Sequence, residues 1–418
     1  MQRRSFMTLA LSACALPAAA TPVPTPAGPT PADLLGATGE PYFIDWLNDY
    51  YTRALAAGAS KAVLDRELSG LSPDPRVSVQ DAGQPEFARP VSVYINGVVS
   101  ADRIAMGIRK RTAITQFPGI EETYGVPREI LIGVWAMESG FGAMQGSMDI
   151  VRSLATLAAL GRRRPWAEGE LSAALKIIDS GEATRAQLKG SWAGAMGQTQ
   201  FLPSAYLSTA VDGDGDGKRD IWGSAPDALA SAANLLAKGG WRRGESWARE
   251  VILGHGFDYG LSEGPKEVPS WWLAKGAKRA DGMAWSKADA AAAAALILPA
   301  GSTGPAFLIF ANHMAIRTYN NSTAYALGVG LLADRMAGCG PLVTPWPKEV
   351  ALSLTERMDA QTALAKQGFN PGTPDGTVGV NTRASLRAWQ KARGLPADGY
   401  LSPDMVRRLR AEMTGVKP

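Results

Sequence analysis

One glutamate stands where a carboxyl group could act as an acid. Glu138 follows the apolar segment 128–137 and precedes Ser-Gly-Phe-Gly. Pro127 suits a first helical turn, and Gly140 and Gly142 suit helix termination. We therefore expect Glu138 at the C-terminal end of an apolar helix, where desolvation and the helix dipole both disfavour a charged carboxylate. A carboxyl group with a raised pKa can protonate a glycosidic oxygen and then act as a base.

A second segment favours catalysis over a purely structural role for this glutamate. Position at a helix end alone is equally compatible with a salt bridge or a loop cap. Residues 191–203, however, combine small residues, which allow close backbone approach, with polar and aromatic side chains that suit a sugar-binding groove. Taken alone, that segment is also compatible with tight helix packing.

Residues 212–223 form an acidic loop with the spacing of an EF-hand calcium loop. Its closely spaced carboxylates repel one another unless a cation is present, so a structural Ca²⁺ has a physical rationale. The expected coordinating acid at the end of the loop is replaced by Gly223, and Ser224 is a weak substitute. A solvated Asp/Gly turn, with Arg219 among its counter-charges, is the alternative. The predicted metal-binding residues are Asp212, Asp214, Asp216, Lys218 and Asp220.

Length and composition set limits on the fold and on the partners. At 418 residues the chain is long enough for two or more domains. Its 43 basic and 39 acidic side chains give only a mild positive charge, so no nucleic-acid partner is expected. Cys14 and Cys339 do not indicate a disulfide framework. His255 and His313 are isolated, which leaves no zinc-ligand spacing and no His-based nucleophile pair.

The N-terminus has the features of an export signal. Residues 1–20 give a basic start, a short apolar core and an Ala-x-Ala ending. Arg3 and Arg4 also resemble a twin-arginine signal, and residues 11–14 resemble a lipobox ending at Cys14. We favour cleavage after Ala20 and a soluble periplasmic product, with a lipid anchor through Cys14 as the alternative.

Composition breaks divide the remaining chain. Apolar residues recur mostly at helical spacing in the main domain, and a Pro-rich stretch ends it. Three short helices are expected near 353–367, 382–393 and 402–411, with two similar Asp-Gly turns between them. Phe369, Trp389 and Leu395 are the expected core of this small unit, and Arg383 is expected towards its surface. The predicted boundaries are 1–20 export signal, 21–35 Pro/Thr/Ala-rich tether, 36–340 main domain, 341–350 stiff linker and 351–413 small domain.

These segments together resemble the membrane-bound lytic transglycosylase B family of peptidoglycan lytic transglycosylases. The motifs that carry the resemblance occur in order, at 85–91, 138–142, 191–203, 304–308, 319–322 and 325–326. Residues 367–376 and 381–390 resemble a three-helix peptidoglycan-binding domain. The resemblance implies a mainly α fold, with a lysozyme-like helical catalytic domain followed by that small C-terminal domain.

The resemblance also implies a mechanism. Glu138 matches the sole catalytic acid/base, and Ser191, Gln200, Tyr319 and Asn320 match residues that line the saccharide groove. The family cuts the β-1,4 bond between MurNAc and GlcNAc without water and leaves a 1,6-anhydroMurNAc end, so no second carboxylate and no cofactor is required. The chain departs from the family pattern at Leu235, where relatives commonly carry a tyrosine.

Two other functions stay open from the sequence alone. One is a lysozyme-type hydrolase on the same scaffold, and the other is a non-catalytic scaffold that binds wall material. The expected partner is the peptidoglycan glycan strand, and proteins of cell-wall synthesis or of the divisome are further candidates. The C-terminal domain is expected to tether the enzyme to polymer and so raise its local concentration.

Overall fold

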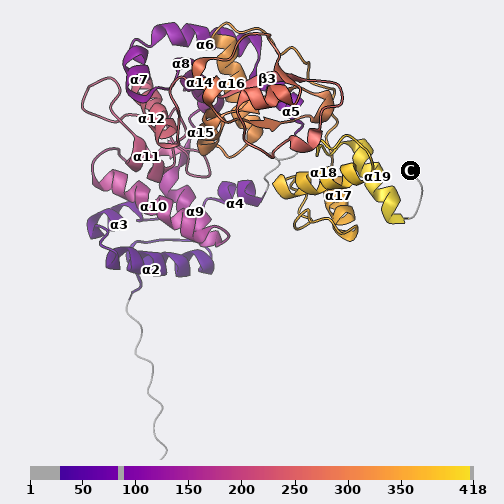
Figure 1. The fold of residues 1–418 in the computed structure, drawn as a ribbon. Coiled ribbons are helices and arrows are strands. Elements are labelled where there is room, and N and C mark those ends of the chain that lie inside the picture. The colour runs from indigo at the N-terminus through magenta and orange to yellow at the C-terminus, as the bar shows by residue number, and fades with distance from the viewer. Residues whose placement is uncertain (1–28, 83–88, 415–418) are drawn as a thin grey trace, which may run out of the picture.

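The computed structural model describes residues 29–82 and 89–414 (Figure 1). The predicted export signal, Cys14, residues 21–28 of the predicted tether and residues 85–88 of the first family motif lie outside the described residues. Within the described ranges, no helix is both long and apolar enough to cross a membrane.

The predicted tether ends earlier than the sequence suggested. Residues 31–34 form helix α1 (Pro31–Leu34), which begins with a capping box between Thr30 and Asp33. Ala32 and Leu35 are buried in the hydrophobic core of the N-terminal helices, which we call the first core. A Pro at the first helical position and a Thr cap favour a helix start, and this local signal outweighs the extended preference of the Pro/Thr/Ala composition.

The N-terminal part of the main domain is a layer of helices stacked on α9 and α10 (Figure 1). Its core includes the fully buried Phe43, Trp46 and Leu47, against which Leu154 and Leu171 pack. The helices of this layer are α2 (Pro41–Ala56), α3 (Lys61–Glu67), α4 (Pro75–Ala82), α9 (Ile150–Leu160), α10 (Arg164–Asp179) and α11 (Pro203–Thr209).

A second helical core surrounds the predicted catalytic segment. Helix α8 (Arg128–Ser139) packs closely on α16 (Thr323–Met336). Gly133 permits this approach, because a Cβ there would lie 2.9 Å from the carbonyl oxygen of Val329. The other helices around this core are α5 (Val91–Val98), α6 (Ala101–Ala113), α7 (Phe117–Tyr124), α12 (Ala225–Lys238) and α15 (Ala311–Tyr319).

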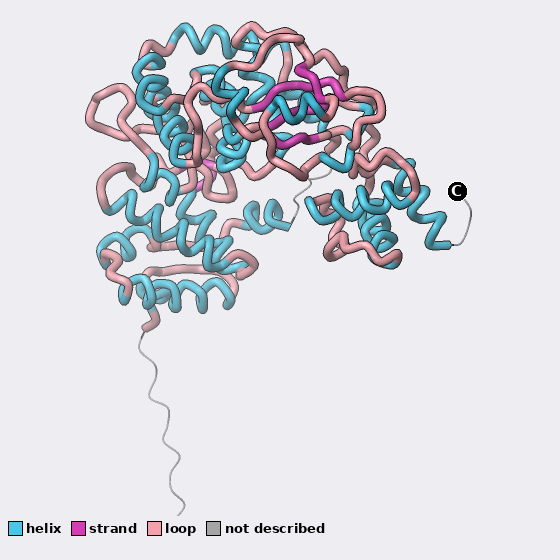
Figure 2. The backbone as a smooth tube through the Cα atoms, in the orientation of Figure 1, coloured by secondary structure: helices cyan, strands magenta, loops and turns pink. Residues whose placement is uncertain are grey.

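A four-stranded antiparallel sheet lies at one side of the helical body (Figure 2). Its order is β4 (Ala277–Arg279), β3 (Ala248–Leu253), β6 (Ala306–Ile309) and β5 (Ala295–Ile297). The short helix α13 (Pro269–Ala274) completes a third core with it, and α14 (Lys287–Ala291) packs on α13. The sequence did not predict this sheet, because its strands are short and two of them lie in alanine-rich sequence. A second, two-stranded sheet joins β1 (Met148–Asp149) and β2 (Lys189–Gly190).

The C-terminal domain contains the three expected helices: α17 (Leu354–Lys366), α18 (Val380–Ala392) and α19 (Pro403–Thr414). Trp389 is fully buried in its core, and Phe369 and Leu395 pack against that core as predicted.

The two Asp-Gly turns of this domain are held in the same way. Gln361 accepts a hydrogen bond from Gly376 N (2.7 Å), and Gln390 accepts one from Gly399 N (2.8 Å). Both glutamines are buried, and both glycines have positive φ. The repetition seen in the sequence is therefore a repeated helix-to-turn contact.

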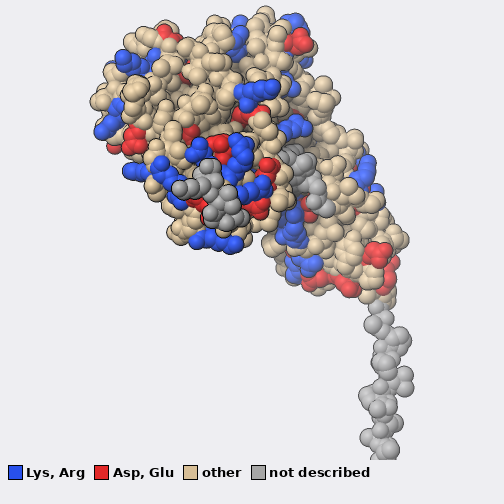
Figure 3. All heavy atoms as spheres, turned by 90° about the vertical axis from the view of Figure 1, so that its right-hand side faces the viewer, with Lys and Arg blue, Asp and Glu red and all other residues tan. Residues whose placement is uncertain are grey.

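The linker is attached to the main domain at several points. Glu250 of β3 accepts hydrogen bonds from Val343 N and Thr344 N of the linker. Glu349 accepts one from Ser92 N and another from the hydroxyl of Tyr400. On the side of the molecule turned to the viewer in Figure 3, basic and acidic side chains are interspersed rather than gathered by sign.

Candidate active site

Glu138 lies in the last turn of α8, as the sequence predicted. The helix ends at Gly140, which is in the left-handed conformation (φ 58°). Phe141 also has positive φ (65°), which is unusual for a residue with a side chain. Its backbone N–H closes the helix on Trp135 O (3.1 Å), and its ring contacts the Trp135 ring edge to face. The chain therefore leaves the axis of α8 within two or three residues of Glu138.

Glu138 is partly buried, and among the described residues one side chain donates a hydrogen bond to its carboxyl group. Burial raises its pKa to about 7, and the hydrogen bond from Tyr325 acts in the opposite direction. The hydroxyl of Tyr325 donates to Glu138 Oε1 at 2.5 Å. No second acidic residue in the described ranges contributes to this shift. A carboxyl group with this pKa can carry a proton near neutral pH and also lose it.

Tyr319 is a predicted groove residue that lies close enough to Glu138 to sense its charge. Burial raises the pKa of its hydroxyl well above the ordinary value, the charge of Glu138 adds to the effect, and Thr199 opposes it. Even so, the buried hydroxyl has no well-formed hydrogen bond within the described part of the chain. A buried, unsatisfied donor beside the acid is available to a ligand.

The segment 191–203 is fastened to the C-terminal end of α8, which carries Glu138. Ser139 donates from Oγ to Gln198 O (2.5 Å) and accepts from Gly142 N (2.9 Å). Gln200, which has positive φ (52°), donates from Nε2 to Gln145 O and Gly197 O. Among the described residues no donor to the side-chain oxygen of Gln200 is found, so this oxygen can accept a hydrogen bond from a ligand.

Ring contacts and exposure place the remaining predicted groove residues. The ring of Phe201 contacts that of Tyr319, with centroids 6.0 Å apart, which joins this segment to the end of α15. Ser191 accepts a hydrogen bond from Ala195 N at the start of the segment, and Asn320 is exposed just beyond α15. Leu235 is partly buried and packs against the first core.

The acidic loop brings together a different set of carboxylates from the predicted one. Oxygen atoms of Asp212, Asp214 and Asp227 lie within 4.8 Å of one another. Asp227 is buried in the first turn of α12 and accepts hydrogen bonds from Gly213 N, Asp214 N and Asp220 N. These are hard oxygen donors of the kind that Ca²⁺ prefers.

The other predicted metal-binding residues lie outside that group. The carboxylate of Asp216 accepts a hydrogen bond from Lys218 N, and that of Asp220 accepts from Trp222 N and Gly223 N. Ser224 donates to Asp214 (2.6 Å) and caps α12.

Sequence reasoning therefore missed Tyr325, Ser139 and Asp227. Tyr325 lies in the motif 325–326 that contributes to the family resemblance, but the sequence indicated no role for it in the site. The available signal for Asp227 was a capping pattern, since Ser224 is followed three residues later by an acid in the first turn of a helix.

Comparison with known proteins agrees with this geometry. Residues 42–334 match the family described as "Transglycosylase SLT domain". The chain belongs to this transglycosylase family. Residues 353–409 match the family described as "Putative peptidoglycan binding domain". The predicted boundaries 36–340 and 351–413 enclose the two matched ranges.

Three relatives illustrate the similarity. SltB3 from Pseudomonas aeruginosa, solved in complex with NAG-anhNAM-pentapeptide, is 44% identical, with a TM-score of 0.84; the match covers 89% of this chain and 100% of that one. Membrane-bound lytic murein transglycosylase B of Escherichia coli (strain K12) is 34% identical over 217 residues, 52% of this chain and 58% of that protein. The match thus spans less than two thirds of this curated relative. Slt35 from Escherichia coli, solved in complex with calcium, is 27% identical, with a TM-score of 0.58, covering 71% and 93% of the two chains.

Proposed function

We propose that the chain is a peptidoglycan lytic transglycosylase that cuts the MurNAc-GlcNAc β-1,4 bond and forms 1,6-anhydroMurNAc ends. The observation that carries this proposal is the carboxyl group of Glu138, whose pKa is raised to about 7 with Tyr325 as its hydrogen-bond donor and with no second acid of the described residues contributing. Most glycosidases that activate water, or that form a glycosyl-enzyme, use two carboxylates. A lone acid suits a reaction in which the substrate supplies its own nucleophile.

The proposed reaction uses Glu138 twice. Protonated Glu138 gives its proton to the glycosidic oxygen as the bond to C1 of MurNAc breaks, and the substrate's acetamido oxygen supports the positive centre. The resulting carboxylate takes the proton of the MurNAc 6-hydroxyl, whose oxygen then bonds to C1. The glutamate ends protonated, and no water is consumed. Tyr325 stabilises the intermediate carboxylate, because its hydroxyl donates to the charged form.

The test is mass spectrometry of the products released from purified sacculi. Anhydro ends support the proposal, reducing ends identify a hydrolase, and the absence of products identifies a scaffold. Glu138→Gln should lower the rate of cleavage at least about a hundredfold, since general acid-base catalysis is worth at least that much.

A matched control lies on the same helix. Glu129, in the first turn of α8, pairs with Arg111 at 3.2 Å, far from the helix end that carries Glu138. Glu129→Gln should retain cleavage. If Glu138→Gln and Glu129→Gln released products at equal rates, the assignment of Glu138 would be wrong.

Location and partners form a second part of the proposal. Relatives that act on the cell wall and a peptidoglycan-binding domain support action on periplasmic glycan strands. Export through residues 1–20 with a soluble periplasmic product, the alternative of a lipid anchor at Cys14, and recruitment of cell-wall synthesis or divisome proteins remain predictions. Cell fractionation of the wild type beside Cys14→Ala tests the anchor. If Cys14 carries a lipid, the variant should leave the membrane fraction while the wild type stays in it.

A structural Ca²⁺ in the acidic loop is a third part. Burial raises the pKa of Asp227, and the charge of Asp214 adds to this effect, so a cation would relieve repulsion within the group. Asp212, Asp214 and Asp227 would hold the ion, and the solved calcium complex of the relative Slt35 supports this proposal. The ion would stabilise the loop and take no part in the chemistry.

A further inference from the structure

A cavity of about 760 Å³ lies between the linker and the main domain; we call it the linker cavity. Its walls come from α5, α16, the strands β3, β4 and β6, and residues 339–346. Asp334 of α16 lines it and stands nine residues after Tyr325, roughly 13 Å further along the helix. None of the predicted saccharide-groove residues is among its lining residues. The linker cavity is therefore separate from the candidate active site.

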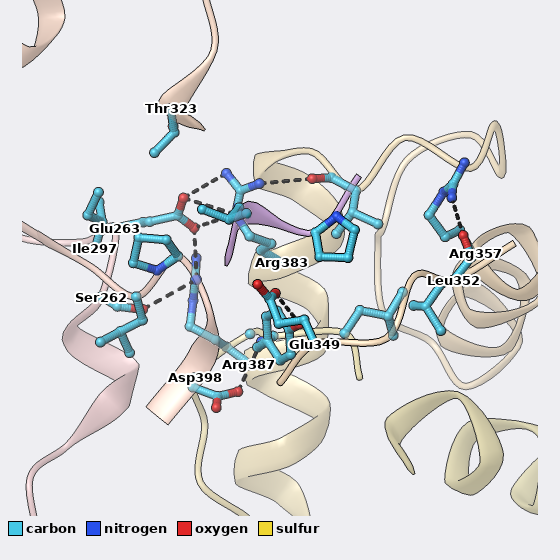
Figure 4. A pocket seen from close by; sticks show the side chains of 18 of the residues that line it. Ser262, Glu263, Ile297, Thr323, Glu349, Leu352, Arg357, Arg383, Arg387 and Asp398 are labelled. Carbon is cyan, nitrogen blue, oxygen red and sulfur yellow. Dashed lines mark hydrogen bonds and ion pairs between the residues drawn. The ribbon is translucent and has the colours of Figure 1, made fainter. Parts of the chain in front are cut away.

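The neighbouring crevice between the two domains, of about 240 Å³, has a different character (Figure 4). Glu263 in its wall is bonded by both Arg383 and Arg387 of α18. Arg357 donates to Leu352 O. These charged groups already use their donors and acceptors within the protein, so the search for a ligand site turns to the linker cavity.

One wall of the linker cavity is aromatic. The rings of Trp247, Phe307 and Trp346 follow one another, with centroids 6.4 Å apart at each step. Trp247 and Phe307 are buried, whereas Trp346 is only partly buried and belongs to the linker. A cavity of this size with an aromatic wall and a few polar groups is typical of small-molecule sites.

The polar groups in the linker cavity include an open acceptor beside open donors. Trp247 Nε1 donates to Asp334 Oδ2 at 3.1 Å. Asp334 Oδ1 lies 3.7 Å from Arg249 Nη1, which is too far for a hydrogen bond, and this nitrogen donates to Ala248 O instead. Among the described residues, no further hydrogen bond to Asp334 Oδ1 or from the Arg249 guanidinium is found. Burial raises the pKa of Asp334 to about 6, as expected for a carboxyl group in a recess.

The other acids that line the cavity already have partners. Glu250 accepts from two backbone N–H groups of the linker, and Asp281 pairs with Arg279. The groups left for a ligand are thus Asp334 Oδ1 and the remaining donors of Arg249.

This pair of groups selects the chemistry of the ligand. An anion would gain from Arg249 but would be repelled by Asp334, and a cation would meet the reverse situation. A hydroxyl group donates and accepts, so neighbouring hydroxyls satisfy both side chains without adding charge. The C–H face of a pyranose ring can in addition pack on a partly exposed indole such as Trp346.

We propose that the linker cavity is a second saccharide site, in which a sugar of the glycan strand lies on Trp346 and its hydroxyls bond to Asp334 and Arg249. This inference takes its ligand from the proposed function. The site would hold a part of the strand that is not being cut. Because the linker supplies Trp346, the site exists only while the linker stays attached to the main domain.

Cys339 provides a local readout, because its exposed thiol lines the linker cavity. The chain has two cysteines, so Cys14→Ala leaves Cys339 as the sole thiol. Mass spectrometry measures the rate at which iodoacetamide alkylates Cys339 with and without a tetramer of β-1,4-linked N-acetylglucosamine. With the tetramer at about ten times its dissociation constant, the rate should fall about tenfold, because only the unoccupied protein reacts.

Two variants in this Cys14→Ala protein test the assigned contacts. Trp346→Ala removes the ring, and Arg249→Met removes the guanidinium but keeps an apolar side chain. Each should raise the dissociation constant of the tetramer about tenfold or more, as expected for loss of a stacking contact or of a hydrogen bond to a charged group.

Matched controls use a tryptophan and an arginine that do not line the cavity. Trp271 packs against the third core, and Arg109 contacts Met106 Sδ on α6. Trp271→Ala and Arg109→Met should keep the protection of Cys339 by the tetramer.

Three results would overturn the inference: no slowing by the tetramer at any concentration, unchanged protection in Trp346→Ala or Arg249→Met, or slowing by the dicarboxylate glutarate but not by the tetramer. The last result would identify an anion site. The readout requires no cleavage, so it is independent of the proposed function. A protein that protects Cys339 but leaves sacculi intact refutes that function and supports the second site.

Discussion

The hydrogen bond from Tyr325 to Glu138 predicts a measurable shift in the pH dependence of cleavage. Tyr325 donates at 2.5 Å to the carboxylate, so it favours the charged form and lowers a pKa that burial has raised to about 7. The hydroxyl stays protonated throughout the relevant range, because burial raises its own pKa well above the ordinary value. Tyr325→Phe removes the donor and keeps the ring, so the pKa of Glu138 should rise.

The size of the shift follows from the strength of such bonds. A hydrogen bond to a charged group contributes about 1.5–3 kcal/mol, and one pKa unit corresponds to about 1.4 kcal/mol. We therefore expect a rise of about one to two units. Glu138 must be protonated to start the reaction, so cleavage by the wild type should decline as the pH rises through about 7. The declining limb of the variant should lie at higher pH.

The assay is the pH profile of kcat/KM on purified glycan strands, which reports the pKa of the free enzyme. Tyr50→Phe is a suitable control, because Tyr50 is a buried tyrosine whose hydroxyl pairs with Ser172 in the N-terminal layer. Its profile should match that of the wild type. A declining limb that stays in place or moves to lower pH in Tyr325→Phe would refute the assigned role of this hydrogen bond.

Three further predictions concern stability and the metal. The pKa of Glu138 is raised from 4.5 to about 7, so between about pH 4 and about pH 8 the wild type should lose about 3 kcal/mol of stability relative to Glu138→Gln. Urea denaturation of both proteins at the two pH values measures this difference. An equal pH dependence of the two proteins would contradict the prediction. Ser139→Ala removes a buried hydroxyl that bonds to both Gln198 O and Gly142 N. This variant should lower the free energy of unfolding by about 1–3 kcal/mol, measured by thermal unfolding, and should slow cleavage. A variant with wild-type stability would show that this contact is dispensable. Ca²⁺ should raise the Tm of the wild type but not that of Asp214→Asn, and an equal rise in both would place the ion elsewhere.

Local features were predicted from the sequence more reliably than features that depend on distant segments. Helix α8 and its glycine end followed from the pattern around Glu138, because caps and apolar periodicity act over a few residues. The three C-terminal helices and their turns followed for the same reason. The sheet was missed, since its strands obtain their stability from partners far along the chain.

The site shows the same division. Tyr325 is 187 residues from Glu138, and only packing of α16 on α8 brings the two together. The acidic loop was recognised, but its third carboxylate belongs to the helix that follows, so Asp227 was not included. Arg383 was expected towards the surface, and the structure instead pairs it with Glu263 of the main domain, a contact that depends on how the two domains meet.

The attachment of the C-terminal domain changes what wall binding can contribute. A loosely held module would only keep polymer nearby, whereas this one is fixed through Glu250 and Glu349 at the linker and Glu263 at α18. We expect a strand held by α17–α19 to meet Glu138 at a set spacing. The domain would then set the distance from the bound end of the strand to the cleaved bond. Its removal should change the length distribution of the released fragments rather than their amount.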